Sequence, residues 1–158
     1  MDRIPTELLG LLGEYRVCSE LIKRGIFATM TYGNRKSVDV YAISDQSDRA
    51  LRIEVKTTQK RAFVTGIGQK YSGDDSYPPA FWVLFQIQDG EEETFAERFF
   101  VLSHKEICEV QAARNQRYQD KYVARHGSVY DVSKGVDDLP VTDVEGFENQ
   151  WLKIAERL

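Results

Sequence analysis

The sequence predicts a single α/β domain in which a mixed β-sheet is flanked by helices. Apolar residues recur at helical spacing near the N-terminus, short segments rich in β-branched and aromatic residues follow, and a capped amphipathic helix comes after them. The order helix, three strands, two further strands and helix is typical of a sheet covered by helices. The chain has 158 residues and no Pro/Gly/Ser-rich linker, so we interpret residues 1–158 as one domain.

The bulk composition is that of a soluble protein, with 42% hydrophobic and 29% charged residues. No apolar run approaches the ~18–20 residues of a membrane span, and the first residues lack the basic start and apolar stretch of a secretion signal. Cys18 and Cys108 lie in apolar contexts without metal-ligand spacing, which favours buried, reduced thiols. These features predict a cytoplasmic protein without membrane contact.

Basic residues are concentrated in two stretches, although the formal net charge is −4. Four lie between Lys23 and Lys36 without an acidic residue, and four lie from Arg52 to Arg61. This distribution predicts a phosphate-lined cleft on an acidic body. The alternative is that these stretches are ordinary solvated faces. The residues we expect to contact nucleic acid are Arg35, Lys36, Lys60 and Arg61.

The first helix is predicted from about Thr6 to Arg24, with Gly25 as its C-terminal stop. Glu14 falls inside the edge of its apolar stripe, whereas the other charged residues of the helix fall outside it. A carboxylate on the core-facing side needs a partner or lines a cavity, which distinguishes Glu14. The expected stripe consists of Leu8, Leu11, Leu12, Tyr15, Cys18, Leu21 and Ile22.

Three strands are predicted at Ile26–Tyr32, Ser37–Ile43 and Ala50–Thr57, and the last two form a hairpin. A symmetric closure between Gln46 and Ser47 places only apolar residues on one face, as strand alternation requires. That face pairs Val38 with Val55, Val40 with Ile53 and Ala42 with Leu51, and the other pairs Asp39 with Glu54, Tyr41 with Arg52 and Ser37 with Lys56.

The remaining chain is predicted to hold two strands and a helix after a long loop. Arg61–Pro79 is rich in glycine and polar residues and is expected to be a flexible loop. Its Tyr71 and Tyr77 suggest either a mobile stacking surface for unpaired bases or a disordered surface loop. Strands are expected at Phe81–Gln88 and Arg98–Leu102. A capping box at Ser103–Glu106 is expected to open a helix that runs to Arg114 or beyond. The C-terminal segment, Val144–Leu158, includes one more short amphipathic segment.

The pair Asp39 and Glu54 is the centre of the predicted chemistry. Directly opposed residues of an antiparallel pair have Cβ atoms ~4.5–5.5 Å apart, so two carboxylates repel unless a cation lies between them. Mg²⁺ and Mn²⁺ prefer such oxygen ligands. Lys56 projects from the same face and can stabilise developing phosphate charge. The alternative is an exposed sheet face with an ordinary salt bridge.

These residues resemble the PD-(D/E)XK nuclease superfamily, in its resolvase-like and restriction-endonuclease-like branches. The resemblance covers about Leu12–Thr58, through Gly13-Glu14, Asp39 and Glu54-Val55-Lys56. It implies a restriction-endonuclease-like fold in which Asp39 and Glu54 hold the metal, the Val55 carbonyl is a further ligand, Lys56 positions or activates water, and Glu14 completes the site. Val38 stands where the family usually has proline. No fifth motif is evident, and Gln69, Gln59 and Lys60 are weak candidates.

The function expected from the sequence is hydrolysis of DNA phosphodiester bonds assisted by Mg²⁺ or Mn²⁺. The alternative is a non-catalytic nucleic-acid- or protein-binding module on the same fold. RNA stays open as a substrate. Cutting two strands often uses two copies of a site, so a homodimer is a further expectation.

Overall fold

The computed structural model describes residues 4–31, 38–71, 77–91 and 94–158. Its main element is a five-stranded sheet in the order β1-β2-β3-β5-β6. Neighbouring strands are antiparallel except β3 and β5, which are parallel, so the sheet is mixed as predicted. The strands are β1 (Phe27–Met30), β2 (Val40–Ile43), β3 (Ala50–Thr58), β5 (Phe81–Asp89) and β6 (Phe95–Ser103).

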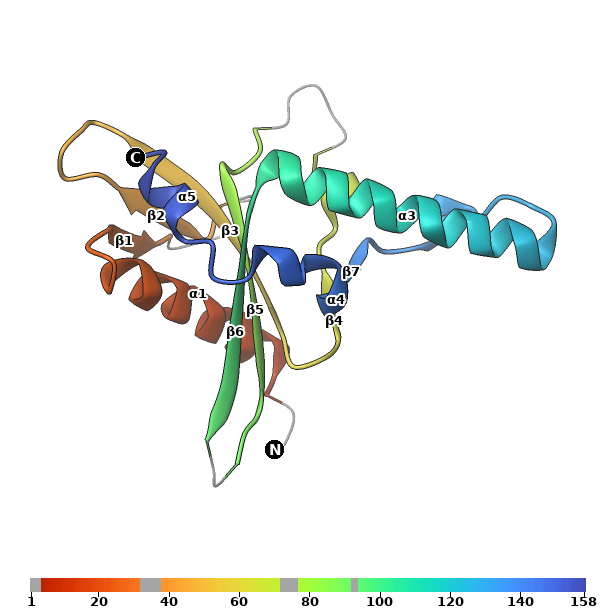
Figure 1. Ribbon diagram of the computed structural model, residues 1–158, viewed down its shortest axis with the longest axis horizontal. Coiled ribbons are helices and arrows are strands. Elements are labelled where there is room, and N and C mark those ends of the chain that lie inside the picture. Colours follow the sequence, from red (N-terminus) through yellow and green to blue (C-terminus); the bar gives the residue numbers. More distant parts are fainter. Residues whose placement is uncertain (1–3, 32–37, 72–76, 92–93) are drawn as a thin grey trace.

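Helices cover both faces of this sheet (Figure 1). On one face, α1 (Thr6–Ile22) packs with alternate strand residues such as Val83 and Phe85 in a first core. On the other face, α3 (His104–His126) packs through Ile107 against residues such as Leu84 and Leu102 in a second core. The strand β5 is buried on both faces from Phe81 to Ile87, which explains its continuous apolar sequence.

The predicted hairpin register is confirmed within the strands. Val40 pairs with Ile53, Tyr41 with Arg52 and Ala42 with Leu51. Val40, Ala42 and Ile53 are fully buried, as the apolar face of the predicted hairpin requires.

The predicted apolar stripe of α1 is partly wrong. Leu8, Leu11, Tyr15 and Ile22 are exposed. The buried face instead runs through Gly13, Val17 and Leu21, at steps of four residues, because Gly13 lies directly against the Thr57 side chain of β3. A small residue at the closest approach, rather than the largest apolar residues, therefore sets the rotation of this helix.

The expected loop at Arg61–Pro79 contains regular structure. It includes β4 (Ala62–Val64), which pairs antiparallel with β7 (Asp138–Pro140), and one helical turn, α2 (Ile67–Lys70). Phe63 and Ile67 are buried in the second core and fix these elements. Tyr71 is partly buried against the second core and packs edge-on against the rings of Trp82 and His104, whereas Tyr77 is exposed.

The C-terminal half of α3 projects from the body of the molecule (Figure 1). This helix runs to His126, well beyond Arg114, and residues 128–137 return along it, including the 3₁₀ turn η1 (Val132–Lys134). We call α3 beyond Gln111, together with residues 128–137, the arm. The chain then forms α4 (Val141–Val144), η2 (Glu145–Phe147) and α5 (Leu152–Ala155), which close the body. None of the helices that the structure describes is long and apolar enough to cross a membrane.

Candidate active site

Asp39 lies one residue before β2, where the chain leaves the regular ladder. Its N–H donates to the Ile53 carbonyl at 3.1 Å, and its Oδ2 accepts the Val55 N–H at 2.7 Å. The Val38 carbonyl accepts a hydrogen bond from the Thr31 hydroxyl at 2.7 Å instead of joining the ladder. The carboxylate of Asp39 thus takes the place of a backbone acceptor and is fixed against β3.

Glu54 is the most enclosed charged residue of the site, with 1% of its surface exposed. Its Oε1 accepts hydrogen bonds from Lys56 Nζ at 2.6 Å and from Lys70 Nζ at 2.5 Å. Its Oε2 is buried and has no hydrogen-bond partner among the residues that the structure describes. An unpartnered buried carboxylate oxygen is costly, so Oε2 is the atom at which a cation would be most favourable.

Lys56 projects from the same face of β3 as Glu54, as the sequence predicts. Its Nζ lies 5.9 Å from the centroid of the Trp82 ring, which limits the space around the ammonium group. The Trp82 indole N–H donates to His104 Nδ1 at 3.1 Å, so this ring is held in place. The lysine is therefore bounded by a fixed aromatic wall on one side and by a carboxylate on the other.

Glu14 approaches the site because its neighbour Gly13 lets α1 come very close to β3. An ideal Cβ on Gly13 would stand 1.9 Å from Thr57 Oγ1 and 3.3 Å from Val55 Cγ1. Burial, and then the negative charge of Asp39, raise the pKa of Glu14. The carboxylate of Glu14 is thus within electrostatic range of Asp39 and Glu54.

The three carboxyl groups have different electrostatic environments. Burial and the charge of Glu54 raise the pKa of Asp39 despite its backbone hydrogen bond. Burial also raises the pKa of Glu54, but the ammonium groups of Lys56 and Lys70 outweigh it and hold that pKa below the usual range. Excess negative charge therefore remains at Asp39 and Glu14.

The donor set fits a hard divalent cation held by few protein ligands. Within the described ranges, no three His, Cys, Asp or Glu side chains converge closely enough to bind a metal on their own. Mg²⁺ is usually held by one or two carboxylates, with water and phosphate completing its shell. Asp39 and Glu54 Oε2 supply two carboxylates of this kind, so the residues present fit such an ion.

Lys70 is a site residue that the sequence analysis did not single out. The Gly66 residue adopts the left-handed conformation, with φ of 61°, and starts the turn α2 that carries this lysine. The available signal was the four-residue spacing of Ile67 and Tyr71, which is typical of a helical turn with one buried face.

Among the predicted nucleic-acid contacts and the two glutamine candidates, none that the structure describes belongs to the group of carboxylates above. Arg35 and Lys36 fall outside the described residues, and Lys60 and Arg61 have exposed side chains in the turn after β3. The two glutamine candidates contact other parts of the chain. Gln59 Oε1 accepts the Ile4 N–H at 3.0 Å, and Gln69 Nε2 donates to the Gly135 carbonyl at 3.3 Å.

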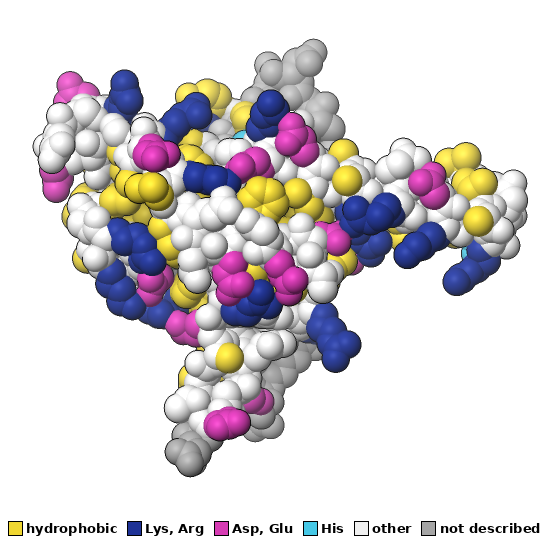
Figure 2. Space-filling model, in the orientation of Figure 1, with side chains coloured by type: hydrophobic (Ala, Val, Ile, Leu, Met, Phe, Trp, Pro, Cys, Tyr) yellow, Lys and Arg dark blue, Asp and Glu magenta, His cyan; other side chains and the backbone are white. Residues whose placement is uncertain are grey.

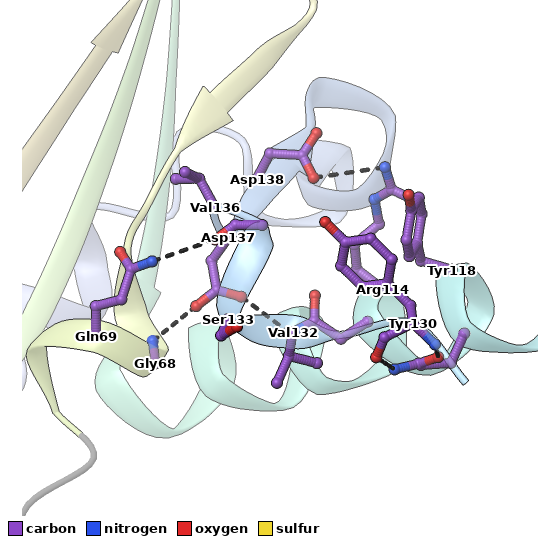
Figure 3. Close-up of a pocket in the computed structure, with 13 residues that line it drawn as sticks. Gly68, Gln69, Arg114, Tyr118, Tyr130, Val132, Ser133, Val136, Asp137 and Asp138 are labelled. Atoms are coloured by element: carbon purple, nitrogen blue, oxygen red, sulfur yellow. Dashed lines mark hydrogen bonds and ion pairs between the residues drawn. The ribbon is translucent and has the colours of Figure 1, made fainter. Parts of the chain in front are cut away.

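A cavity of about 660 Å³ lies between α2, α3 and the returning segment of the arm (Figure 3). Asp137 connects these elements, because its carboxylate accepts the Gly68 N–H at 2.7 Å and the Asn115 amide at 3.0 Å. The carboxylates and lysines of the candidate site do not line this cavity. These hydrogen bonds of Asp137 hold α2, and with it Lys70, to the arm.

The sequence matches no protein-family model. No curated protein matches it either. Among solved structures, the chain is similar to a bacterial homing endonuclease, I-Ssp6803I, with a TM-score of 0.50. The superposition covers 97% of this chain and 94% of that chain, at 16% sequence identity. The mixed five-stranded sheet flanked by helices is thus a fold similar to that of a known nuclease.

Proposed function

We propose that this protein is a metal-dependent endonuclease that hydrolyses DNA phosphodiester bonds with Mg²⁺ or Mn²⁺. The observation that carries the proposal is the environment of Glu54. One of its oxygens is saturated by Lys56 and Lys70, while Oε2 is buried without a partner in the described part of the chain. A second carboxylate with a raised pKa, Asp39, lies one residue before the neighbouring strand β2. The similarity in fold to a homing endonuclease supports the same activity.

The site residues predicted from the sequence have separate roles in this proposal. Asp39 and Glu54 would hold the cation, with the Val55 carbonyl as a further ligand. When bound, the cation would supply Lewis-acid polarisation of the scissile phosphate and make a coordinated water more acidic. Lys56 would donate to a phosphate oxygen as negative charge develops there. Because the pKa of Glu14 is raised, its carboxylate would accept a proton from the attacking water more readily than an ordinary glutamate.

Plasmid nicking tests this proposal directly. Purified protein should convert supercoiled DNA to nicked or linear forms with Mg²⁺ or Mn²⁺. Asp39→Asn, Glu54→Gln and Lys56→Met should each lower the rate by about a hundredfold or more. Asp45→Asn, which removes an exposed acid from the turn between β2 and β3, is the matched control and should cut normally. Nicking that survives all three site substitutions would contradict the proposal.

The alternative function, a non-catalytic nucleic-acid- or protein-binding module, has one observation in its favour. Lys56 and Lys70 already compensate the charge of Glu54 and hold its pKa below the usual range, so this glutamate can serve the structure alone. Calorimetric titration with Mn²⁺ separates the two functions. A protein that binds no divalent ion, alone or with DNA, belongs to the second class. Presenting labelled RNA in the nicking assay decides between the two nucleic acids.

A further inference from the structure

The arm carries a row of basic residues on one face of α3. Arg114, Arg117, Lys121 and Arg125 follow at steps of three, four and four residues. At about 100° per residue, these positions fall within roughly 80° of arc and extend over about 16 Å of helix. Residues 112–130 contain four Lys or Arg and one acid, Asp120, whereas the whole chain has a net charge of −4. Figure 2 shows dark blue side chains along one side of the projecting arm.

Two of these cations are available to a partner. Arg114 and Arg117 form ion pairs with Asp138 and Asp143. Lys121 and Arg125 are exposed, and neither has an ion-pair partner in the part of the chain that the structure describes. The unpaired positive charge is therefore concentrated toward the end of the arm.

The projecting part of α3 contributes no buried residue to the core. The structure describes all of α3, and its buried residues are Ile107 and Gln111, both in the first two turns. Beyond them, the helix is stabilised by its own contacts with the returning segment, in which the Tyr118 and Tyr122 rings pack against Tyr130. A helix held out from the body in this way presents its charged face to solvent.

We infer that the arm is a docking surface for the phosphate backbone of duplex DNA, with Lys121 and Arg125 as its principal contacts. Charge complementarity identifies this partner, because a DNA strand presents one negative charge about every 3.4 Å along the helix axis. The inference rests on the proposed function for the identity of the substrate. The arm is also joined to the candidate site, since Asp137 and Gly135 of its returning segment hold α2, which carries Lys70.

Salt-dependent binding tests this surface separately from cleavage. The affinity of the full chain for a fluorescent random-sequence duplex is measured from about 50 to 200 mM salt, in EDTA to remove the divalent ions that the proposed cleavage needs. The double variant Lys121→Gln/Arg125→Gln should weaken binding about ten- to sixtyfold near 0.1 M salt and reduce the slope of log K against log salt by about 1.8. Lys105→Gln/Arg157→Gln removes the same charges from exposed sites outside the arm and should bind like the wild type.

The outcomes separate the arm from the active site. Equal binding and equal slopes for the two double variants would overturn the docking surface, whether or not the wild type nicks plasmid. Loss of affinity in the arm variant alone supports it, even if the wild type proves unable to cut, a result that would overturn only the proposed function. A wild type that binds no duplex at low salt overturns the docking surface. A dimer in sedimentation that the arm variant converts to monomer, with an unchanged slope, would assign the surface to a second copy of the chain.

Discussion

Replacement of Gly13 by alanine tests how α1 positions the site. The added methyl group would stand 1.9 Å from Thr57 Oγ1 and 3.1 Å from Thr57 Cβ. Carbon atoms in contact are normally ~3.5–4.0 Å apart, so a rotation of the Thr57 hydroxyl relieves the first clash but not the second. The helix must therefore move away from β3 by several tenths of an ångström or more.

The expected cost of this overpacking is about 1–3 kcal/mol. Alanine is also a better helix former than glycine, by about 0.8–1.0 kcal/mol, which partly offsets that cost. Gly10→Ala separates the two effects, because Gly10 lies in the same helix and nothing stands within 4 Å of its ideal Cβ. We expect Gly13→Ala to be less stable than Gly10→Ala by about 1–3 kcal/mol, a difference free of the propensity contribution.

Urea unfolding of both variants measures this difference, with equal m-values as the check that only native stability has changed. In a thermal scan it corresponds to about 2–4 °C per kcal/mol. Gly13→Ala/Thr57→Ala should regain part of the lost stability because it removes the oxygen that the methyl group meets. Gly13→Ala should also slow nicking, since the adjacent Glu14 moves with the helix. A Gly13→Ala variant as stable and as active as Gly10→Ala would refute this account of the helix.

Three further predictions concern ionisation. Because burial and Glu54 raise the pKa of Asp39, its contribution to stability is lost as pH rises through its folded pKa. Asp39→Asn should therefore abolish cutting, yet without divalent ions it should be more stable than the wild type at pH 7 by about 0.2–1 kcal/mol. Urea unfolding should show no such gain in stability near pH 3, which is about a unit below the usual pKa of Asp. The pKa of Glu54 is lowered, so its contribution to the free energy of unfolding is present at neutral pH and lost in acid. Glu54→Gln should lower the free energy of unfolding by about 1.5–3 kcal/mol at pH 7, and an unchanged urea midpoint would contradict this. Burial raises the pKa of the Cys18 thiol to about 11, so iodoacetamide should label Cys108 first and Cys18 only on unfolding, as mass spectrometry of the intact protein can follow.

The sequence alone predicted a mixed sheet flanked by helices and the register of the β2–β3 hairpin, which the structure confirms from Val40 to Ala42. Strand alternation fixed the hairpin register, because any one-residue slip would have moved Val40 and Ile53 out of the core. The same argument placed Lys56 on the face of Glu54, where the structure has it. These inferences succeed because they depend on neighbours within one hairpin.

Features set by distant contacts could not be predicted in the same way. The face that α1 buries depends on how closely Gly13 approaches Thr57 of β3. A helical wheel shows only the residues of the helix itself and gives no information on this contact. The contribution of Lys70 depends on α2, whose N-terminus is held by Asp137, a residue 69 positions from Gly68. Glycine-rich sequence indicated a loop there, but the burial of Phe63 and Ile67 against β5 and β6 outweighs that local preference.

Crystals soaked in Mn²⁺ provide the most direct test of the active-site proposal, by way of the anomalous scattering of the ion. The proposal predicts a peak bonded to Glu54 Oε2 and to an oxygen of Asp39, and its loss in Asp39→Asn. No peak at millimolar Mn²⁺, or a peak bonded to neither carboxylate, would contradict it.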